Sequence, residues 1–197
     1  STLSRAEDTV DLLLSICFIS ALVFAEDENF DRIVMQAEKG NVSAQFILGI
    51  MYFKGQGASQ DYNEAFKWFQ KAAEQGLPEA QYNIGEMFYQ GKGVSQNYVE
   101  AHKWFNKAAK QNFSKAQYNL GVMYASAEGV PKDYVKAYAW LTVAYRNEFE
   151  EAKSNILILN KKMTASEMQQ AEVEAANLRK NIKKWKFSFI VHKHQKY

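Results

Sequence analysis

Residues 80–94 read AQYNIGEMFYQGKGV, and the chain contains two close copies of this stretch. Residues 44–58 read AQFILGIMYFKGQGA and residues 116–130 read AQYNLGVMYASAEGV, so successive copies lie 36 residues apart. Tyrosine, alanine and tryptophan positions recur with the same spacing in the remainder of each block. A fixed period of this length predicts a stack of similar supersecondary units, whose function lies on a repeated surface.

Each unit has the pattern of two helices joined by a turn. In the first unit, apolar residues recur at i, i+4, i+7 and i+8 from Ala44 onward, which predicts a first helix over residues 43–54. The sequence Gly55-Gln56-Gly57 breaks this helix. A second helix is predicted to begin near Asp61 and to end at Gly76.

Glycine interrupts the first helix of each unit, where it costs roughly 1 kcal/mol relative to alanine. We therefore expect the two helices of a unit to approach too closely there for a β-carbon, with an alanine of the second helix opposite. The tryptophan of each second helix is expected to fill the space between neighbouring hairpins, and capping boxes are expected to start these helices. The glycines are Gly49, Gly85 and Gly121, the alanines Ala65, Ala101 and Ala137, the tryptophans Trp68, Trp104 and Trp140, and the boxes Asp61-x-x-Glu64 and Asn97-x-x-Glu100.

The strings at residues 80–94 and 98–109, the second of which reads YVEAHKWFNKAA, resemble the Sel-1-like repeat (SLR), a relative of the tetratricopeptide repeat. The resemblance implies an all-α fold, an α/α solenoid in which the hairpins form a right-handed superhelix. It also implies protein binding, often in exported, envelope or host-directed bacterial proteins. The three repeats are expected at residues 43–78, 79–114 and 115–150.

The copies depart from the common pattern at several places. Ala127-Glu128-Gly129 replaces Gly-x-Gly in the third unit, and Asn112 stands where Gly76 ended the earlier unit. In a fourth unit Leu157 occupies the glycine position, so the array is expected to end there. The cysteine-rich branch of the family closes each hairpin with a disulfide, which a chain whose single cysteine is Cys17 cannot form. The β-lactam binding proposed for that branch is therefore not expected here.

The flanking segments are predicted to cover the two ends of the array. Residues 26–42 hold one helix, over Phe30 to Lys39, that would cap the front. Residues 151–186 hold the degenerate fourth repeat and a final helix, which starts at the capping box Thr164-x-x-Glu167, continues to about Lys184 and would cap the rear. Its apolar stripe is expected to consist of Met168, Ala171, Ala175 and Leu178.

The amino-terminal residues carry an uncharged run, residues 12–25, that is too short for a comfortable transmembrane helix of about 20 residues. It ends in Val23-Phe24-Ala25, so residues 1–25 are predicted to be a signal peptide and the protein to be periplasmic or secreted. The acidic residues before the run leave two alternatives open, an uncleaved membrane anchor and a buried first helix.

Catalytic chemistry has no candidate residues in this sequence. It contains no Ser-x-x-Lys and no Gly-x-Ser-x-Gly, and the run Gly85–Lys92 fails the phosphate-loop pattern in both spacing and the residues that follow. His102, His192 and His194 are interpreted as solvated surface residues rather than metal ligands. We expect no catalytic residue, cofactor or metal, and an enzyme would require a further domain.

The net charge of +2 gives no reason to expect nucleic-acid binding. Charge is nevertheless concentrated at the carboxyl end, since residues 179–197 contain seven lysine or arginine residues and no acidic residue. Residues 187–197 are interpreted as a basic tail. Contact between this tail and an anionic lipid or carbohydrate surface of the envelope is the alternative function.

The concave side of such a stack is lined by the first helices, and this is where we predict a peptide or protein partner to bind. Asparagine amides can pair with an extended backbone, and tyrosines give contact area at low entropic cost. The predicted partner-binding residues are Phe46, Ile50, Phe53, Tyr82, Asn83, Glu86, Tyr89, Tyr118, Asn119 and Val122.

Overall fold

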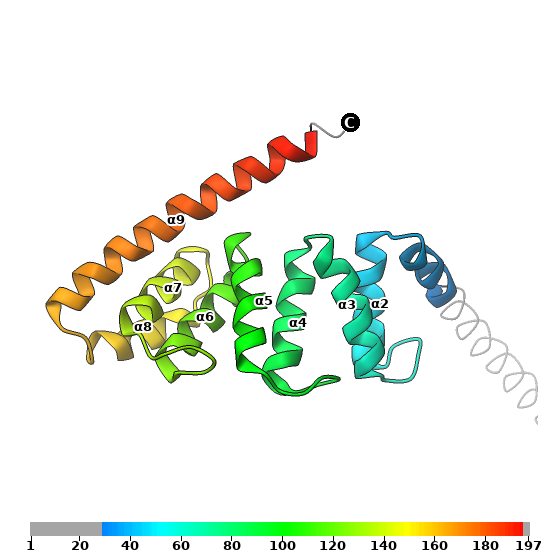
Figure 1. The fold of residues 1–197 in the computed structure, drawn as a ribbon, viewed down its shortest axis with the longest axis horizontal. Helices are drawn as coiled ribbons and strands as arrows, with labels where there is room; N and C mark the ends of the chain where they lie inside the picture. The colour runs from blue at the N-terminus through cyan, green and yellow to red at the C-terminus, as the bar shows by residue number, and fades with distance from the viewer. Residues whose placement is uncertain (1–28, 195–197) are drawn as a thin grey trace, which may run out of the picture. The chain divides into compact units, whose positions relative to one another are not determined.

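The computed structural model describes residues 29–194, with side chains through Lys184, and its regular structure over that range is helical (Figure 1). Pairs of helices stack as an all-helical repeat, as the sequence predicts. The chain forms two compact units, which divide between Trp68 and Phe69 within α3. The helices are α2 (Val42–Lys54), α3 (Tyr62–Glu74), α4 (Pro78–Gln90), α5 (Tyr98–Lys110), α6 (Ser114–Ser126), α7 (Tyr134–Arg146), α8 (Ala152–Asn160) and α9 (Ala165–His194).

The first unit contains a helix over residues 29–38, α2 and the start of α3. Apolar side chains of the helix at residues 29–38, including Phe30 and Ala37, pack against Ala44 and Leu48 of α2, and Trp68 covers the same cluster. A helix thus lies where the sequence predicts a front cap. The predicted signal peptide at residues 1–25 lies outside the described residues.

The first helix of each repeat ends in a left-handed residue, and in the first two repeats this residue is the predicted glycine. Gly55 and Gly91 have φ values of 71° and 70°, and each N–H returns to a carbonyl four residues earlier. In the third repeat Ala127 adopts the same conformation, with φ 62°, although a β-carbon disfavours it by roughly 1–2 kcal/mol. Asn112 is left-handed too, but its Oδ1 accepts a hydrogen bond of 2.8 Å from Asn147.

The capping boxes of the repeats are only half formed. Asn97 Oδ1 accepts from the N–H of Glu100 at 3.1 Å, and Asp61 caps α3 in the same way. The reciprocal half of the prediction is wrong, because the Asn97 N–H donates to the Phe88 carbonyl at 2.8 Å. Both halves form only at Thr164-x-x-Glu167, where the glutamate accepts from the Thr164 N–H at 2.8 Å and the threonine hydroxyl accepts from the Glu167 N–H at 3.3 Å.

Helix pairs of the second unit approach closely at the internal glycines. A β-carbon on Gly85 would lie 2.6 Å from two ring carbons of Phe105, and one on Gly121 would lie 2.6 Å from Leu141 Cγ. The close approach is therefore confirmed at both positions. The residues opposite are the larger Phe105 and Leu141, so the expectation of facing alanines is wrong for Gly85. At Gly121 the predicted alanine, Ala137, is near the added β-carbon only through its backbone carbonyl oxygen, at 3.0 Å.

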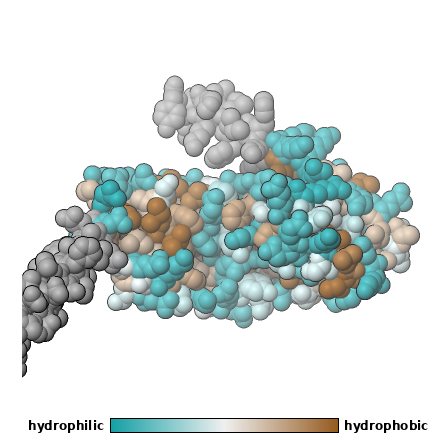
Figure 2. Space-filling view, turned by 180° about the vertical axis from the view of Figure 1, so that it is seen from behind, coloured by the Kyte–Doolittle hydropathy of each residue, from teal (hydrophilic) through white to brown (hydrophobic). Residues whose placement is uncertain are grey.

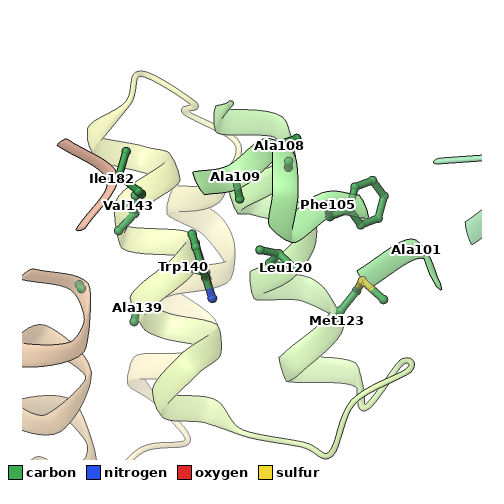
Figure 3. Packing of buried hydrophobic residues seen from close by; sticks show 12 residues of the cluster. Ala101, Phe105, Ala108, Ala109, Leu120, Met123, Ala139, Trp140, Val143 and Ile182 are labelled. Atoms are coloured by element: carbon green, nitrogen blue, oxygen red, sulfur yellow. The ribbon is translucent and has the colours of Figure 1, made fainter. Parts of the chain in front are cut away.

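The tryptophans of the second unit do not share one role. Trp140 is buried in a core of α5, α6, α7 and α9 residues that also contains Phe105, Leu120 and Met123 (Figure 3). Trp104 is only half-buried, and the ammonium of Lys107 lies 3.7 Å from its ring centroid. The expectation that every tryptophan fills the space between hairpins is therefore wrong for Trp104. The fully buried Phe105, next in sequence, occupies the interior.

Buried glutamines join consecutive repeats. Gln81 Nε2 donates to the carbonyl of Ala73 at 3.2 Å, and Gln81 Oε1 accepts from Gln111 Nε2 at 2.9 Å. One side chain of α4 thus bonds to the ends of both α3 and α5, which satisfies polar groups that would be costly to bury alone. The same two bonds recur 36 residues later, at 3.1 and 2.7 Å, among Gln117, Ala109 and Asn147.

The carboxyl end departs furthest from the expectation. α8 has only nine residues, and Leu157, at the former glycine position, is exposed. α9 continues ten residues beyond the predicted end at Lys184, so the predicted basic tail at residues 187–197 is helical as far as His194. Instead of only capping the rear, α9 runs back along α7 and reaches α5 (Figure 1).

The predicted stripe of α9 makes this contact. Ala171 packs with the buried residues of α7 and α8, and Ala175 joins the core around Trp140, as does Ile182, which the prediction did not include. Glu172 adds polar contacts with α7, since it accepts from the Tyr138 hydroxyl at 3.0 Å and lies 3.6 Å from Arg146. Among the described helices, none is both long enough and apolar enough to cross a membrane. The surface seen in Figure 2 is mainly hydrophilic, with hydrophobic residues in small separate patches.

Candidate functional site

A cavity of about 290 Å³ lies between α4 and α6, the first helices of the second and third repeats. Six of the ten residues predicted from the sequence line it, and Gln90 is the one lining residue that the prediction missed. We call this cavity the α4–α6 groove. Its lining residues are Tyr82, Glu86, Tyr89, Gln90, Tyr118, Asn119 and Val122.

A second cavity, of about 180 Å³, is next to the α4–α6 groove. The two cavities share Val122, and the second is formed by α6, α7 and α8, with Tyr134, Asn155 and Lys162 among its lining residues. The surface of the first helices therefore offers two adjacent depressions on either side of Val122.

Four predicted residues do not contribute to the α4–α6 groove. Asn83 is half-buried on α4 but does not line the cavity. Phe46, Ile50 and Phe53 lie on α2, in the first unit, where the Phe53 ring packs edge-on against Tyr62 with 5.0 Å between centroids.

Side-chain hydrogen bonds cross the α4–α6 groove and connect its two walls. Asn119 Nδ2 of α6 donates to Glu86 Oε1 of α4 at 2.6 Å, while Gln90 Nε2, also on α4, donates to Glu86 Oε2 at 2.8 Å. The Tyr89 hydroxyl donates to Glu128 Oε2, in the loop after α6, at 2.8 Å. The predicted asparagine–peptide pairing must therefore compete with an existing bond at Asn119.

The next pair of first helices is joined in the same way. Asn155 of α8 occupies the position 36 residues after Asn119, and its Nδ2 donates to the Tyr118 hydroxyl of α6 at 3.1 Å. Amide side chains at this position thus hold adjacent first helices together, and they set the width of the depressions between them.

The tyrosine rings of the groove also belong to the protein core. Tyr82 packs against Phe105 and Phe113, with 5.6 and 5.2 Å between ring centroids, and Tyr118 packs against Phe149 at 5.0 Å. Tyr82 and Tyr118 therefore contribute to the packing between helices as well as to the groove. Each of these rings lines the cavity and is held in place by its contacts with the core.

Burial and negative charge both act on these phenols. Burial raises the pKa of Tyr82, and the nearby Glu86 carboxylate raises it further. Burial likewise raises the pKa of Tyr89, followed by its hydrogen bond to Glu128 and by the charges of Glu128 and Glu86. Both phenols are therefore neutral hydrogen-bonding groups at physiological pH, in a region of negative potential.

The sequence analysis did not predict two residues of the site, Gln90 and Glu128, for different reasons. Gln90 lies eight residues after Tyr82, so helical periodicity alone could have placed it on the same face. Glu128 follows α6 in a loop, and its bond to Tyr89 spans 39 residues, which no local pattern reveals.

His102 is not the solvated residue that the sequence suggested. It is half-buried on α5, its ring packs edge-on against Tyr124 with 5.4 Å between centroids, and its Nε2 is buried without a hydrogen-bond partner. Burial, and secondarily the charge of Lys136, lower the pKa of this imidazole. Within the described part of the chain no group of three or more potential ligands is placed to hold a metal ion.

Comparison with known families finds the Sel1 repeat at residues 42–77, 78–113 and 114–148, more than half of the chain. These ranges begin one residue before the predicted repeats at residues 43, 79 and 115. Sel1 repeats are protein-interaction modules. Among curated proteins, a match of 42% identity over 48 residues is found with the ERAD-associated E3 ubiquitin-protein ligase component HRD3A of Arabidopsis thaliana, covering 24% of this chain and 7% of that protein.

Two bacterial crystal structures resemble the chain more extensively. A protective antigen present in uropathogenic Escherichia coli strains, which displays an SLR fold, matches with a TM-score of 0.61 and 30% identity, over 81% of this chain and 42% of the antigen. A Sel1 repeat protein from Oxalobacter formigenes matches with a TM-score of 0.62 and 32% identity, over 71% and 58% of the respective chains. This chain thus spans less than two thirds of each relative.

Proposed function

The chain belongs to the Sel1 repeat family, and from this premise we propose that it is a non-enzymatic scaffold that binds a peptide or protein partner in the α4–α6 groove. The observation that carries the proposal is the pair of adjacent cavities that share Val122 on the first helices. The second cavity is smaller than the roughly 300–1,000 Å³ typical of small-molecule sites, and the first is at the lower end of that range. Two adjacent cavities of this size could each accept a side chain from the same peptide segment of a partner.

The groove is also pre-organised for binding. The core fixes the rings of Tyr82 and Tyr118, and the Asn119–Glu86 hydrogen bond fixes the distance between the helices that carry them. A partner that binds such a surface loses its own freedom but does not have to order the receptor, which favours affinity.

Export is part of this proposal. Its support is the uncharged run at residues 12–25, followed by acidic residues, and the resemblance to a protective antigen of uropathogenic Escherichia coli strains. A scaffold exposed to the envelope or to a host would meet its partner there. Amino-terminal sequencing of protein recovered outside the cytoplasm tests this proposal: a chain that begins at Glu26 supports it, and an intact Ser1 contradicts it.

Photo-crosslinking at defined positions tests the groove itself. The full chain would carry p-benzoylphenylalanine in place of Gln90, which is exposed and lines the groove, or in place of Lys103, which is exposed on α5. In cells that express the protein, we expect a discrete adduct from position 90 and none from position 103. A third variant with the crosslinker at Lys184 of α9 addresses the envelope-contact alternative. Adducts at position 184 without any at position 90 would contradict the groove proposal.

A further inference from the structure

We propose that the α4–α6 groove selects a cationic side chain of its partner, with arginine preferred over lysine. This inference rests on the proposed function and specifies the chemistry of the segment that binds. It would explain which peptides enter the groove, whereas the proposed function states only that a segment does.

The formal charges at the α4–α6 groove are all negative. Glu86 lines the cavity, Glu128 bonds to the Tyr89 hydroxyl at its edge, and no lysine or arginine is among the lining residues. Among the described side chains neither carboxylate is in an ion pair, whereas Glu64 of α3 and Glu100 of α5 pair with Lys67 and Lys103 at 2.6 Å. A cation would therefore find two charges that this part of the chain does not neutralise.

Both carboxylates retain hydrogen-bonding capacity. The donors to Glu86 are the neutral amides of Asn119 and Gln90, and the donor to Glu128 is the neutral phenol of Tyr89. An ionised carboxylate offers about four acceptor sites. A guanidinium could thus add charge-assisted hydrogen bonds without displacing the bonds that hold α4 and α6 together.

Aromatic rings complete the environment for a cation. Tyr82, Tyr89 and Tyr118 all line the cavity, and a cation within about 6 Å of such a ring gains electrostatic attraction. Arginine gains more than lysine, because its planar guanidinium can stack on a ring while it bonds to a carboxylate. The same charges repel carboxylate and phosphate groups, so an acidic peptide or a nucleic-acid backbone is disfavoured at this position.

The test is an NMR titration of the full chain with three capped tripeptides. They are acetyl-Gly-Arg-Gly-amide, its citrulline analogue, which has nearly the same shape without the charge, and its glutamate analogue. We expect the arginine peptide to shift amide resonances of residues 82–90 and 118–122 and to bind at least about tenfold more tightly than the citrulline peptide. The glutamate peptide should cause no shift in these residues.

Matched glutamine variants identify the charges responsible. Glu86→Gln and Glu128→Gln keep the shape of the side chain, and each should reduce binding of the arginine peptide by several-fold or more. Glu100→Gln, on the exposed face of α5, should have no effect. Equal binding of the arginine and citrulline peptides would overturn the cation inference but leave the groove proposal standing. Absence of any shift in α4 and α6 with the arginine peptide would also overturn it, while the crosslinks at position 90 separately decide the proposed function.

Discussion

Replacement of Gly85 by alanine should destabilise the protein, although alanine is the better helix former. In an unobstructed helix the change would stabilise by roughly 1 kcal/mol. Here the new β-carbon would lie 2.6 Å from both Cδ1 and Cε1 of Phe105, closer than carbon atoms can pack. The ring cannot swing aside easily, since Phe105 is fully buried and packs against Tyr82 and Tyr89. Overpacking of this kind costs about 1–3 kcal/mol, so the net loss should be about 1 kcal/mol.

Urea denaturation monitored by circular dichroism measures this loss, and the double variant with Phe105→Leu tests its cause. With the smaller leucine opposite, Gly85→Ala should become neutral or stabilising, which corresponds to a coupling of about 0.5–3 kcal/mol between the two positions. A single Gly85→Ala variant that is more stable than the wild type would refute the close packing of α4 against α5. Additive effects of the two substitutions would refute the contact between Gly85 and Phe105.

Three further predictions concern stability. Ala127→Gly should stabilise the protein by about 1 kcal/mol, because it removes a β-carbon from a left-handed residue, whereas Ala125→Gly within α6 should destabilise it by a similar amount; urea midpoints of the two variants compare them. Gln117→Leu should cost about 1–3 kcal/mol in the same assay, since it removes the bond that Gln117 donates to the Ala109 carbonyl and the bond that it accepts from the Asn147 amide, and each of these groups keeps only its bond to Asn112. Burial lowers the pKa of His102 in the folded protein, so the unfolded chain takes up the proton first and stability should fall as pH drops below about 6.5. The variant His102→Gln should show a weaker loss between pH 7.5 and 5.5, and identical pH profiles would contradict this assignment.

The sequence predicts the structure best where a backbone conformation or a close helix approach permits only one residue type. The left-handed helix ends at Gly55 and Gly91 and the close approach at Gly85 all follow from what only glycine allows, so a repeated glycine could be interpreted directly. Ala127 departs from this pattern, because it occupies the position of the first glycine of Gly-x-Gly in the third repeat. Its left-handed conformation became evident only in the structure, where the loop geometry is retained without glycine.

The sequence was least informative where contacts depend on the order of stacking. Trp104 and Trp140 occupy equivalent positions, but α9 covers Trp140 together with Ile182, and a period of 36 residues cannot predict which repeat a later helix will cover. The sequence likewise does not show that α9 continues through residues 185–194, because an excess of lysine and arginine over residues 179–197 is compatible with either a helix or a tail.

The sequence predicts the α4–α6 groove only in part. Helical periodicity placed Tyr82, Glu86 and Tyr89 on one face, which the structure bears out. Periodicity could not show that Tyr82 also belongs to the core, nor that Asn119 is engaged by Glu86 on the neighbouring helix. These two contacts join residues 23 and 33 positions apart in the sequence, and they depend on the distance between helices.

The most direct test of the binding surface is the effect of a bulky residue at the position that both cavities share. Peptides that bind the full chain would be selected from a random displayed library, and their affinities measured for the wild type, Val122→Trp and Val99→Trp. Val99 is exposed on α5, so it provides the same substitution away from the α4–α6 groove, and circular dichroism confirms that each variant is folded. We predict that Val122→Trp weakens binding at least about tenfold while Val99→Trp leaves it unchanged. Selected peptides that bind Val122→Trp as tightly as the wild type would contradict the assignment of the α4–α6 groove as the binding surface.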